Sequence, residues 1–480
     1  MKLRLQHCVF FWALCFLAFI RLPGLNIEDN DVWWHLRTGQ LISQTHRIPT
    51  HDPFSYTAQG QPWMAHEWLS ELLFYKFYAR MGLAGVILLD SILVSLMLLG
   101  IYFLVRRYLK PTPLLFGVAM LCAVGTIPFW SPRPQLFTYA FLSGIILLLD
   151  GWADKKLVWI TVPMFFLWSN LHGGWVIGFA IMGVILADYS IEAARQGRLA
   201  VAKRSVAVCL CSLAAIALGP GHIERLVYPI RYLSGAIPTG IVSEFTSPDF
   251  HDKSFLSFLA ILVLMPLMLY LGKKPLRPSQ WVLMIGFLCA SLFSVRHVPV
   301  FTLLMAPILA VQVASIFDQY EEANGQVVWS FVPESKMLNW VTLILAAFVA
   351  FLTFPRAVDE ASCVPANDFP AQACKYLANN PKIGQGHLLN TYDWGGYLIY
   401  KLYPKYLVSI DGRADVHIGH EVEDMTSLDS FSPKWKQQIA KRNPDVILWP
   451  SDKALAVILN EDPQWRRVYH DKVADVFVKR

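Results

Sequence analysis

Apolar segments of roughly the length needed to cross a bilayer recur along this 480-residue sequence up to about residue 354, and they constrain its fold more than any other feature. One helical crossing takes roughly 17–25 predominantly apolar residues. The chain is 55% hydrophobic and only 16% charged, whereas soluble domains carry about 25% charged residues. The sequence therefore predicts a polytopic α-helical membrane protein and excludes soluble, disordered and collagen-like proteins.

The apolar segments predict eleven transmembrane helices. Their ranges are about 7–22, 83–104, 112–130, 135–151, 157–170, 173–190, 204–219, 255–272, 279–294, 299–317 and 338–354. We expect the first to be retained, because Arg21-Leu-Pro-Gly24 follows it where a signal peptide would carry small residues for cleavage. The fifth and sixth are close enough in sequence to form a tight or re-entrant hairpin.

Basic residues gather in the connections on one side of these helices. They are Lys2, Arg4, Arg106, Arg107, Lys110, Lys155, Lys156, Arg195, Arg198, Lys203, Arg204, Lys273, Lys274, Arg277 and Lys336. The positive-inside rule makes that side cytoplasmic, so the N-terminus is inside and an odd number of helices places the C-terminal segment outside. We expect a multi-pass protein of the bacterial cytoplasmic (inner) membrane. Because the net charge of +6 is spread over small clusters, we expect no nucleic-acid partner.

The composition changes after the last apolar segment. Charged residues return, and β-rich runs occur at residues 406–410, 445–449 and 473–478. About 125 residues are enough to build a separate core. We therefore expect residues 355–480 to form a small periplasmic α/β domain.

Two domains follow from this division of the chain. Residues 1–354 are the predicted transmembrane domain, which includes a first periplasmic loop at 23–82.

Six of the eight cysteines lie in predicted helices, and the other two, Cys363 and Cys374, lie in the exported domain. Because disulfides persist in oxidising compartments, we expect these two to be bridged.

Polar residues collect in the predicted outer loops. The segments are Glu28–Gly39, His51–Tyr56, Trp63–Glu71, Ser131–Gln135, Asn170–Gly174, Glu244–Asp249 and Val295–Pro299. A transporter would be expected to place its ionisable residues near mid-membrane, on broken helices. The pattern instead favours a site at the outer membrane interface, where all seven segments can meet.

Three acids, Glu28, Asp29 and Asp31, precede a predicted helix in the first outer loop. Asp31 and His35 are four residues apart and share a face of that helix. A carboxylate in this position could accept a proton from an attacking hydroxyl or hold a divalent cation. The alternative is that Asp31 caps the helix, but three acids exceed what one cap needs.

Arg133 and Arg296 stand at the outer ends of predicted helices, each close to a proline. A guanidinium can bind a phosphate through two parallel hydrogen bonds, and lipid phosphate is available at that depth. His172 and His297 could contact the same phosphate or a metal. The alternatives are arginines that extend to ordinary headgroups and histidines that act as structural hydrogen-bond donors.

His66-Glu67 matches half of a zinc-protease motif. Ser70 occupies the place of the second histidine, so we reject the protease interpretation.

The segment Asp31-Val-Trp-Trp-His-Leu-Arg37 resembles the first-outer-loop signature of GT-C membrane glycosyltransferases, especially the catalytic subunit of oligosaccharyltransferase. The chain is also similar to bacterial glycosyltransferase-like membrane proteins. The shared patterns are Trp-Trp-His-Leu, Asp-Pro-Phe-Ser, His-Glu-Trp-Leu, Asn-Leu-His-Gly-Gly and Asp-Gly-Arg. This resemblance spans nearly the whole chain and is specific for the group, but much weaker for any one reaction.

The resemblance implies a GT-C-like fold with an outer-face active site, a polyprenyl-phosphate-linked sugar donor and inversion at the sugar. Asp31 would be the leading catalytic or metal-binding carboxylate, with Asp29 or Glu28 as its neighbour and Glu67 as a further catalytic candidate. A divalent cation, Mg²⁺ or Mn²⁺, is left open, because the next outer loop carries no clear second acidic pair.

The tail segment Tyr392-Asp-Trp-Gly-Gly-Tyr397 is similar to the oligosaccharyltransferase motif Trp-Trp-Asp-Tyr-Gly, which recognises the acceptor peptide. It differs in residue order and in its extra glycine. The residues expected to contact the acceptor or join the domains are His35, His66, Asp393, Trp394, Asp411 and Arg413.

We therefore expect an inverting glycosyltransferase that moves a hexosyl or pentosyl group from a polyprenyl phosphate, within the membrane lipid, to an extracytoplasmic glycan, lipid or protein. One alternative is a lipid-linked saccharide flippase or transporter, against which the lack of mid-membrane charge pairs counts, with Asp90 as the exception. The other is a non-enzymatic envelope assembly protein, which would leave the acids and arginines without a role.

Overall fold

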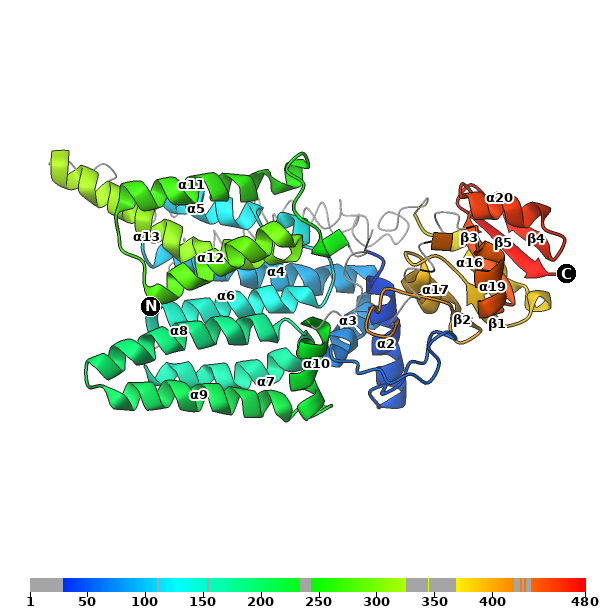
Figure 1. The fold of residues 1–480 in the computed structure, drawn as a ribbon, viewed down its shortest axis with the longest axis horizontal. Helices are drawn as coiled ribbons and strands as arrows, with labels where there is room; N and C mark the ends of the chain where they lie inside the picture. Colours follow the sequence, from blue (N-terminus) through cyan, green and yellow to red (C-terminus); the bar gives the residue numbers. More distant parts are fainter. Residues whose placement is uncertain are drawn as a thin grey trace. The chain divides into compact units, whose positions relative to one another are not determined.

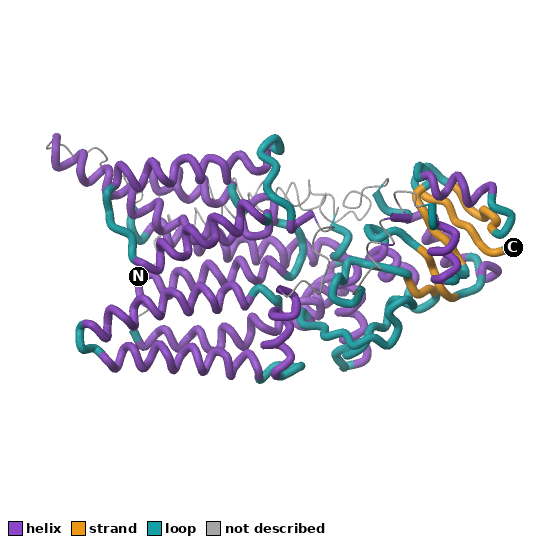
Figure 2. The backbone as a smooth tube through the Cα atoms, viewed as in Figure 1, coloured by secondary structure: helices purple, strands orange, loops and turns teal. Residues whose placement is uncertain are grey.

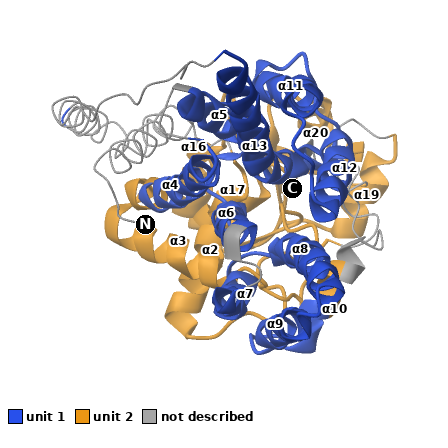
Figure 3. Cartoon of the chain, turned by 90° about the vertical axis from the view of Figure 1, so that its left-hand side faces the viewer, with its two compact units in different colours: residues 1–21, 88–226, 242–353 blue, residues 22–87, 227–241, 354–480 orange. Residues whose placement is uncertain are grey.

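The chain divides into two compact units, which are described separately below (Figure 3). Unit 1 comprises residues 1–21, 88–226 and 242–353, and unit 2 comprises residues 22–87, 227–241 and 354–480. The computed structural model describes residues 29–109, 113–152, 155–233, 243–324, 344, 368–417, 424, 427–428 and 433–480.

Unit 1 is built from apolar helices that lie side by side (Figures 1 and 2). They are most of α4 (Leu83–Arg106), α5 (Pro113–Val124), α6 (Gln135–Trp152), α7 (Thr161–Leu171), α8 (Trp175–Arg195), α9 (Leu199–Ala217), α11 (Leu256–Gly272), α12 (Pro278–Phe293) and α13 (Val298–Asn324). The start of the amphipathic helix α10 (Ile223–Leu233) also belongs to unit 1. Helix α13 packs against α5, α6, α11 and α12, and every residue from Val298 to Ala310 is buried. A helix that is apolar on all sides is expected at such a central position.

Short 3-10 helices connect or precede several of these elements. They are η2 (Ile127–Phe129), η3 (Lys156–Ile160), η4 (Ser243–Phe245), η5 (Lys253–Phe255) and η6 (Val295–His297). Helices α7 and α8 form the tight hairpin that the sequence predicts, because only residues 172–174 separate them.

Nine of the eleven predicted membrane segments coincide with apolar helices in the described part of the chain. Within that part, five helices are long and apolar enough to cross a membrane, and four further apolar helices are shorter. The predicted segment 7–22 and nearly all of 338–354 lie outside the described residues. The structure therefore supports a multi-pass membrane protein, while the number eleven is not confirmed.

The tail forms a five-stranded sheet in unit 2, with the strand order β2-β1-β3-β5-β4. The strands are β1 (Gly386–Leu389), β2 (Tyr406–Val408), β3 (Val446–Pro450), β4 (Trp465–His470) and β5 (Ala474–Lys479). Strands β1, β2 and β3 pair in parallel, and β5 pairs antiparallel with β3 and β4. The three β-rich runs predicted from the sequence correspond to β2, β3 and β5, so these predictions are confirmed.

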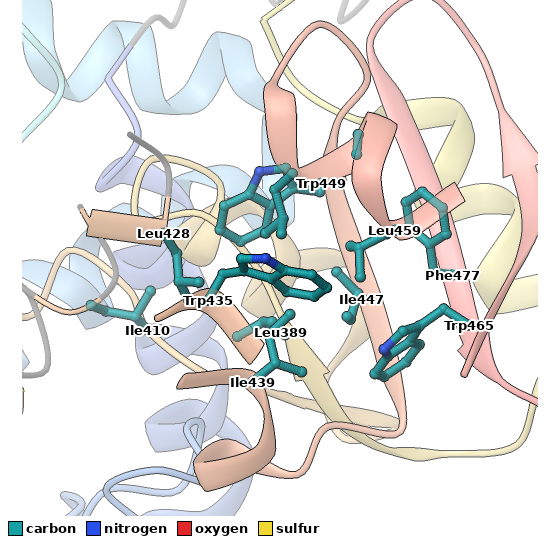
Figure 4. Close-up of a cluster of buried hydrophobic side chains, with 12 residues drawn as sticks. Leu389, Ile410, Leu428, Trp435, Ile439, Ile447, Trp449, Leu459, Trp465 and Phe477 are labelled. Carbon is teal, nitrogen blue, oxygen red and sulfur yellow. The ribbon is translucent and has the colours of Figure 1, made fainter. Parts of the chain in front are cut away.

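Helices and an apolar cluster complete the tail. The helices are α16 (Ala371–Asn379), η7 (Pro381–Ile383), α17 (Gly395–Leu402), α19 (Trp435–Arg442) and α20 (Ala454–Glu461). The cluster contains Ile447 and Trp449 of β3 together with Trp435 of α19 and Leu459 of α20 (Figure 4). Burial of these side chains supplies the tail with a core of its own.

The first loop is built into unit 2 rather than into the helical unit. It contributes α2 (Val32–Thr45) and α3 (Trp68–Met81), and α2 packs against α17. Trp33 is fully buried, with its ring 5.9 Å from Phe369 and 5.1 Å from Tyr397. Residues 54–57 also extend the sheet, because Ser55 forms a parallel bridge with Val408 of β2.

This arrangement differs from the predicted domains. The predicted boundary between 354 and 355 nearly matches the start of the last segment of unit 2, but the first loop belongs with the tail. Apolar side chains such as Trp33, which the sequence places next to a membrane span, are buried by tail residues instead. Cys374 is buried on α16, and its predicted disulfide partner Cys363 lies outside the described residues, so the disulfide stays a prediction.

Candidate functional site

The first candidate cluster lies in unit 2, around the start of α2. Asp31 directly precedes this helix, and its Oδ1 accepts a hydrogen bond from the Trp34 indole Nε1 at 3.0 Å. The Asp29 carboxylate accepts a hydrogen bond from the backbone N–H of Asp31 at 3.0 Å. Although Asp31 occupies the N-cap position, its side chain makes no capping hydrogen bond, so the helix-cap interpretation does not explain this carboxylate. Glu28 lies outside the described residues.

His35 is buried and contacts two acids of the first loop. Its Nδ1 lies 3.3 Å from Glu71 Oε1, and its Nε2 lies 3.9 Å from Glu67 Oε2. Glu67 Oε1 is in turn 3.5 Å from His66 Nε2. Burial, assisted by the Glu67 charge, raises the pKa of Glu71 well above its usual value. Burial has the opposite effect on the pKa of His66, but Glu67 outweighs it and raises that pKa.

Arg413 is fully buried between two carboxylates. Its Nε and Nη2 donate to the two oxygens of Asp411 at 2.8 and 2.7 Å, and its Nη1 lies 2.7 Å from Asp52 Oδ1. The guanidinium carbon lies 5.0 Å from the ring centre of Phe54 and 4.6 Å from that of Trp63. The two-pronged contact with Asp411 and the aromatic faces match the geometry that a guanidinium prefers.

Further polar groups extend this contact. The His417 Nε2 lies 3.2 Å from Asp411 Oδ2, and the Tyr228 hydroxyl donates to Asp415 Oδ2 at 3.2 Å. Burial alone would raise the pKa of Asp411, but Arg413 and His417 hold it well below its usual value. The carboxylate of Asp411 is therefore ionised throughout the physiological range.

The second candidate cluster lies in unit 1 and centres on Glu244. Its carboxylate forms an ion pair with Arg133, and the Arg296 guanidinium lies 4.8 Å from the ring centre of the adjacent Phe245. Burial opposes ionisation of Glu244, but Arg133 and then Arg296 lower its pKa. The backbone N–H of Val295 donates to the Thr246 carbonyl at 2.9 Å, which ties the two loops together.

The two predicted histidines of unit 1 have different surroundings. The Nδ1 of His172 accepts from the Gly174 N–H at 3.0 Å and lies 2.6 Å from the Thr138 hydroxyl. This nitrogen is thus held in a structural hydrogen-bond network, in which it accepts from Gly174. His297 is half-buried, and its ring centre lies 6.4 Å from that of Phe287.

Several of the predicted site residues contact one another in the structure. In unit 2, His35 and His66 both contact Glu67, and Asp411 pairs with Arg413. In unit 1, Arg133 pairs with Glu244. Asp393 is exposed, and Trp394 donates its indole N–H to the Asp368 carbonyl at 2.9 Å. Asp52, Glu71 and Glu244 lie in predicted outer-loop segments but were not singled out as site residues. The residues outside those segments that the sequence interpretation missed are Tyr228, Asp415 and His417.

A divalent cation remains an open expectation. No group of three or more His, Cys, Asp or Glu side chains among the described residues is arranged to hold a metal ion. Asp29 and Asp31 would supply only part of a Mg²⁺ ligand shell, which is usually completed by waters and substrate phosphates. We therefore assign no chemical step to a metal.

Comparison with known proteins identifies the fold. A scan of protein-family models found no match, and neither did a search of curated proteins. The structure is similar to the archaeal oligosaccharyltransferase AglB from Archaeoglobus fulgidus, solved with an inhibitory peptide and a dolichol-phosphate. The TM-score is 0.59 and the identity 13%, with 93% of this chain and 69% of that chain covered.

A second similar structure is ArnT from Cupriavidus metallidurans, solved with undecaprenyl phosphate bound. The TM-score is 0.54 and the identity 13%, with 98% of this chain and 97% of that chain covered. Both proteins are GT-C membrane glycosyltransferases, so the predicted GT-C-like fold is confirmed.

We expect Glu71→Gln to stabilise the protein at neutral pH. The pKa of Glu71 is raised in the folded state, so the stability that this group provides is fully present below about pH 4.5 and is lost as the pH rises toward the folded pKa. The loss is at most about 1.4 kcal/mol per pH unit. Because an amide carries no charge into the buried site, the advantage of the variant should grow with pH.

Melting temperatures of wild type and Glu71→Gln in detergent, measured from about pH 5 to pH 8, test this expectation. Glu461→Gln, at an exposed position on α20, is the matched control. A difference between Glu71→Gln and wild type that does not change with pH would contradict it.

Proposed function

We propose that this protein is an inverting glycosyltransferase that moves a hexosyl or pentosyl group from a polyprenyl-phosphate-linked donor to an acceptor outside the cytoplasm. The observation that supports this most strongly is the fold shared with ArnT over 98% of this chain and 97% of that one. That structure contains undecaprenyl phosphate, and AglB was solved with dolichol-phosphate and a peptide. A lipid phosphate is therefore the proposed donor carrier, and a glycan, lipid or protein the acceptor.

In the proposed reaction, an acceptor hydroxyl attacks the anomeric carbon of the donor sugar from the face opposite the phosphate. The new carbon–oxygen bond forms as the bond to the phosphate oxygen breaks, which inverts the configuration. The bonding electrons leave with the polyprenyl phosphate, and the hydroxyl proton is transferred to a general base. Asp31 is the proposed base, because its half-buried carboxylate is held by Trp34 and does not cap α2.

The departing phosphate needs positive charge to stabilise it. Arg133 and Arg296 are the proposed ligands, since together they carry two positive charges against the single carboxylate of Glu244. Glu244 would fix the Arg133 side chain, while the cluster keeps a net positive charge for the donor. His172 and His297 remain proposed neighbours of the phosphate.

The general-base role predicts a specific loss of turnover in Asp31→Asn. The amide keeps the size of the side chain, so folding should survive, whereas turnover should fall by roughly 10²–10⁴-fold, the usual contribution of a positioned base. Transfer from a radiolabelled polyprenyl-phosphate sugar by purified protein measures this. Asp452→Asn, which changes an exposed acid of unit 2, should transfer at the wild-type rate.

A fully active Asp31→Asn protein would remove Asp31 from the mechanism and direct attention to Asp29 and Glu67. If wild-type protein transfers no label to any acceptor but moves lipid-linked saccharide across vesicle membranes, the protein is a flippase. If it does neither, an assembly role is favoured.

Arg133→Lys and Arg296→Lys should weaken use of the donor. Lysine keeps the charge but loses the two-pronged phosphate contact, so KM for the donor should rise by roughly 10-fold or more. Arg107→Lys is the matched control, because Arg107 pairs with Asp150 at 2.8 Å, at the other end of α6 from Arg133. An equal rise in KM for all three variants would argue against phosphate binding by Arg133 and Arg296.

The proposed reaction requires the first loop and the tail to lie outside the cytoplasm. The distribution of Lys and Arg supports a cytoplasmic N-terminus and a periplasmic C-terminus in the bacterial inner membrane. Alkaline phosphatase, which is active only in the periplasm, should therefore be active when fused after Arg480. Fluorescence from a cytoplasm-only reporter at the same position would reverse the proposed orientation.

A further inference from the structure

The backbone of Gly412 lies directly against the carboxylate of Asp31. A Cβ atom added at Gly412 would overlap Asp31 Oδ1 and would lie 3.4 Å from Trp34 Nε1. The same Oδ1 accepts the hydrogen bond from that indole nitrogen. Only glycine allows the tail backbone to approach the carboxylate this closely.

Gly412 is itself held in a rigid loop. Its two neighbours, Asp411 and Arg413, form the buried two-pronged ion pair, and Arg413 also contacts Asp52 of the first loop. The Arg413 backbone N–H donates to Asp411 Oδ1 at 2.9 Å, which closes the loop on itself. All three of these side chains are buried, so their positions are fixed by packing as well as by charge.

A second glycine, Gly396, also packs against the turn that carries Asp31. A Cβ atom at Gly396, in the first turn of α17, would overlap the Asn30 carbonyl and lie 3.2 Å from Trp34 Cδ1. Gly396 belongs to a Gly-Gly pair that resembles part of an acceptor-binding motif in sequence, and it packs against the turn that carries Asp31. Its two nearest groups belong to the residue before Asp31 and to the residue that donates to Asp31.

We propose that Gly412 and Gly396 are positioning residues, which hold the Asp31 carboxylate and its Trp34 partner in the orientation needed for proton transfer. The inference rests on the proposed function in taking Asp31 as the base. The tail domain would thus act in catalysis by setting the geometry of a first-loop residue. The ion pair between Asp411 and Arg413 keeps the loop rigid, and the lack of a side chain at Gly412 leaves room for the Asp31 carboxylate.

Gly412→Ala tests this through turnover. The added methyl group should displace the Asp31 carboxylate, and a misplacement of about 1 Å can cost on the order of 10²-fold in rate. If Gly412 acts only through Asp31, the substitution should cause no further loss in an Asp31→Asn background. The same cycle with Gly396→Ala should also be non-additive, and a smaller loss is expected there because the contact is with Asn30 and Trp34.

Gly286→Ala on α12 is the matched control, because an added Cβ there meets no atom within 4 Å. It should turn over at the wild-type rate. Wild-type turnover in Gly412→Ala, or the same fold-loss with and without the Asp31 carboxylate, would overturn the proposal.

A measurement that does not depend on transfer separates this inference from the proposed function. In protein labelled with ¹⁵N-tryptophan, the Trp34 indole resonance is assigned by its absence in Trp34→Phe. That resonance should shift in Gly412→Ala and in Asp31→Asn, but not in Gly286→Ala, while the other indole resonances keep their folded dispersion. An unchanged Trp34 resonance in Gly412→Ala would show that Gly412 does not position this group, even if the protein proves to be a transferase. A shifted Trp34 resonance in a protein without transferase activity would support the contact between Gly412 and Asp31 and would argue against the proposed glycosyl transfer.

Discussion

The buried contact of Arg413 with Asp52 and Asp411 is the interaction on which unit 2 most depends. A guanidinium taken out of water is stabilised only when its hydrogen bonds and counter-charges are supplied, and removal of one partner from such a pair commonly costs about 3–5 kcal/mol. Asp411 comes from the tail and Asp52 from the first loop, so one arginine joins segments at opposite ends of the sequence. Ser55, which extends the sheet, is close in sequence to Asp52, and Gly412, which lies against the Asp31 carboxylate, stands between Asp411 and Arg413.

The two clusters have opposite electrostatic character. In the unit 2 cluster, carboxylates outnumber the Arg413 guanidinium, and the pKa of Glu71 is raised while that of Asp411 is lowered. Environments that push the pKa values of neighbouring acids apart are typical of sites that move protons, although structural ion pairs also do so. In unit 1, two arginines face one glutamate, which suits the binding of an anion. The proposed transfer needs both kinds of chemistry, a proton acceptor and a phosphate ligand.

Sequence patterns predicted what depends on local physics. The length of the apolar segments located nine helices of the described chain, and the β-rich runs located β2, β3 and β5, because hydrophobic length and β-branched composition act within one segment. The short motifs that contain Asp52, Asp411 and Arg413 were visible as patterns. Their pairing could not be predicted, because a local sequence pattern does not specify which distant carboxylate an arginine in the tail will contact.

Long-range packing accounts for the features that local sequence patterns did not predict. The first loop was assigned to the membrane domain, but the aromatic face of α2 is buried by α17 and Phe369. Asp31 stands where a helix cap would, yet a tryptophan one turn later takes its hydrogen bond. Glu244 was not singled out, because its role follows from the two arginines that lower its pKa.

The division of unit 2 between early and late parts of the chain has a consequence for biosynthesis. Residues 22–87 leave the ribosome long before residues 354–480, and most helices of unit 1 are made between them. Until the tail is complete, Trp33 has no Phe369 or Tyr397 to bury it, and Asp52 has no Arg413 to neutralise it. The candidate base is therefore assembled last, so a chain that stops short of the tail can contain every helix of unit 1 and still lack a formed site around Asp31.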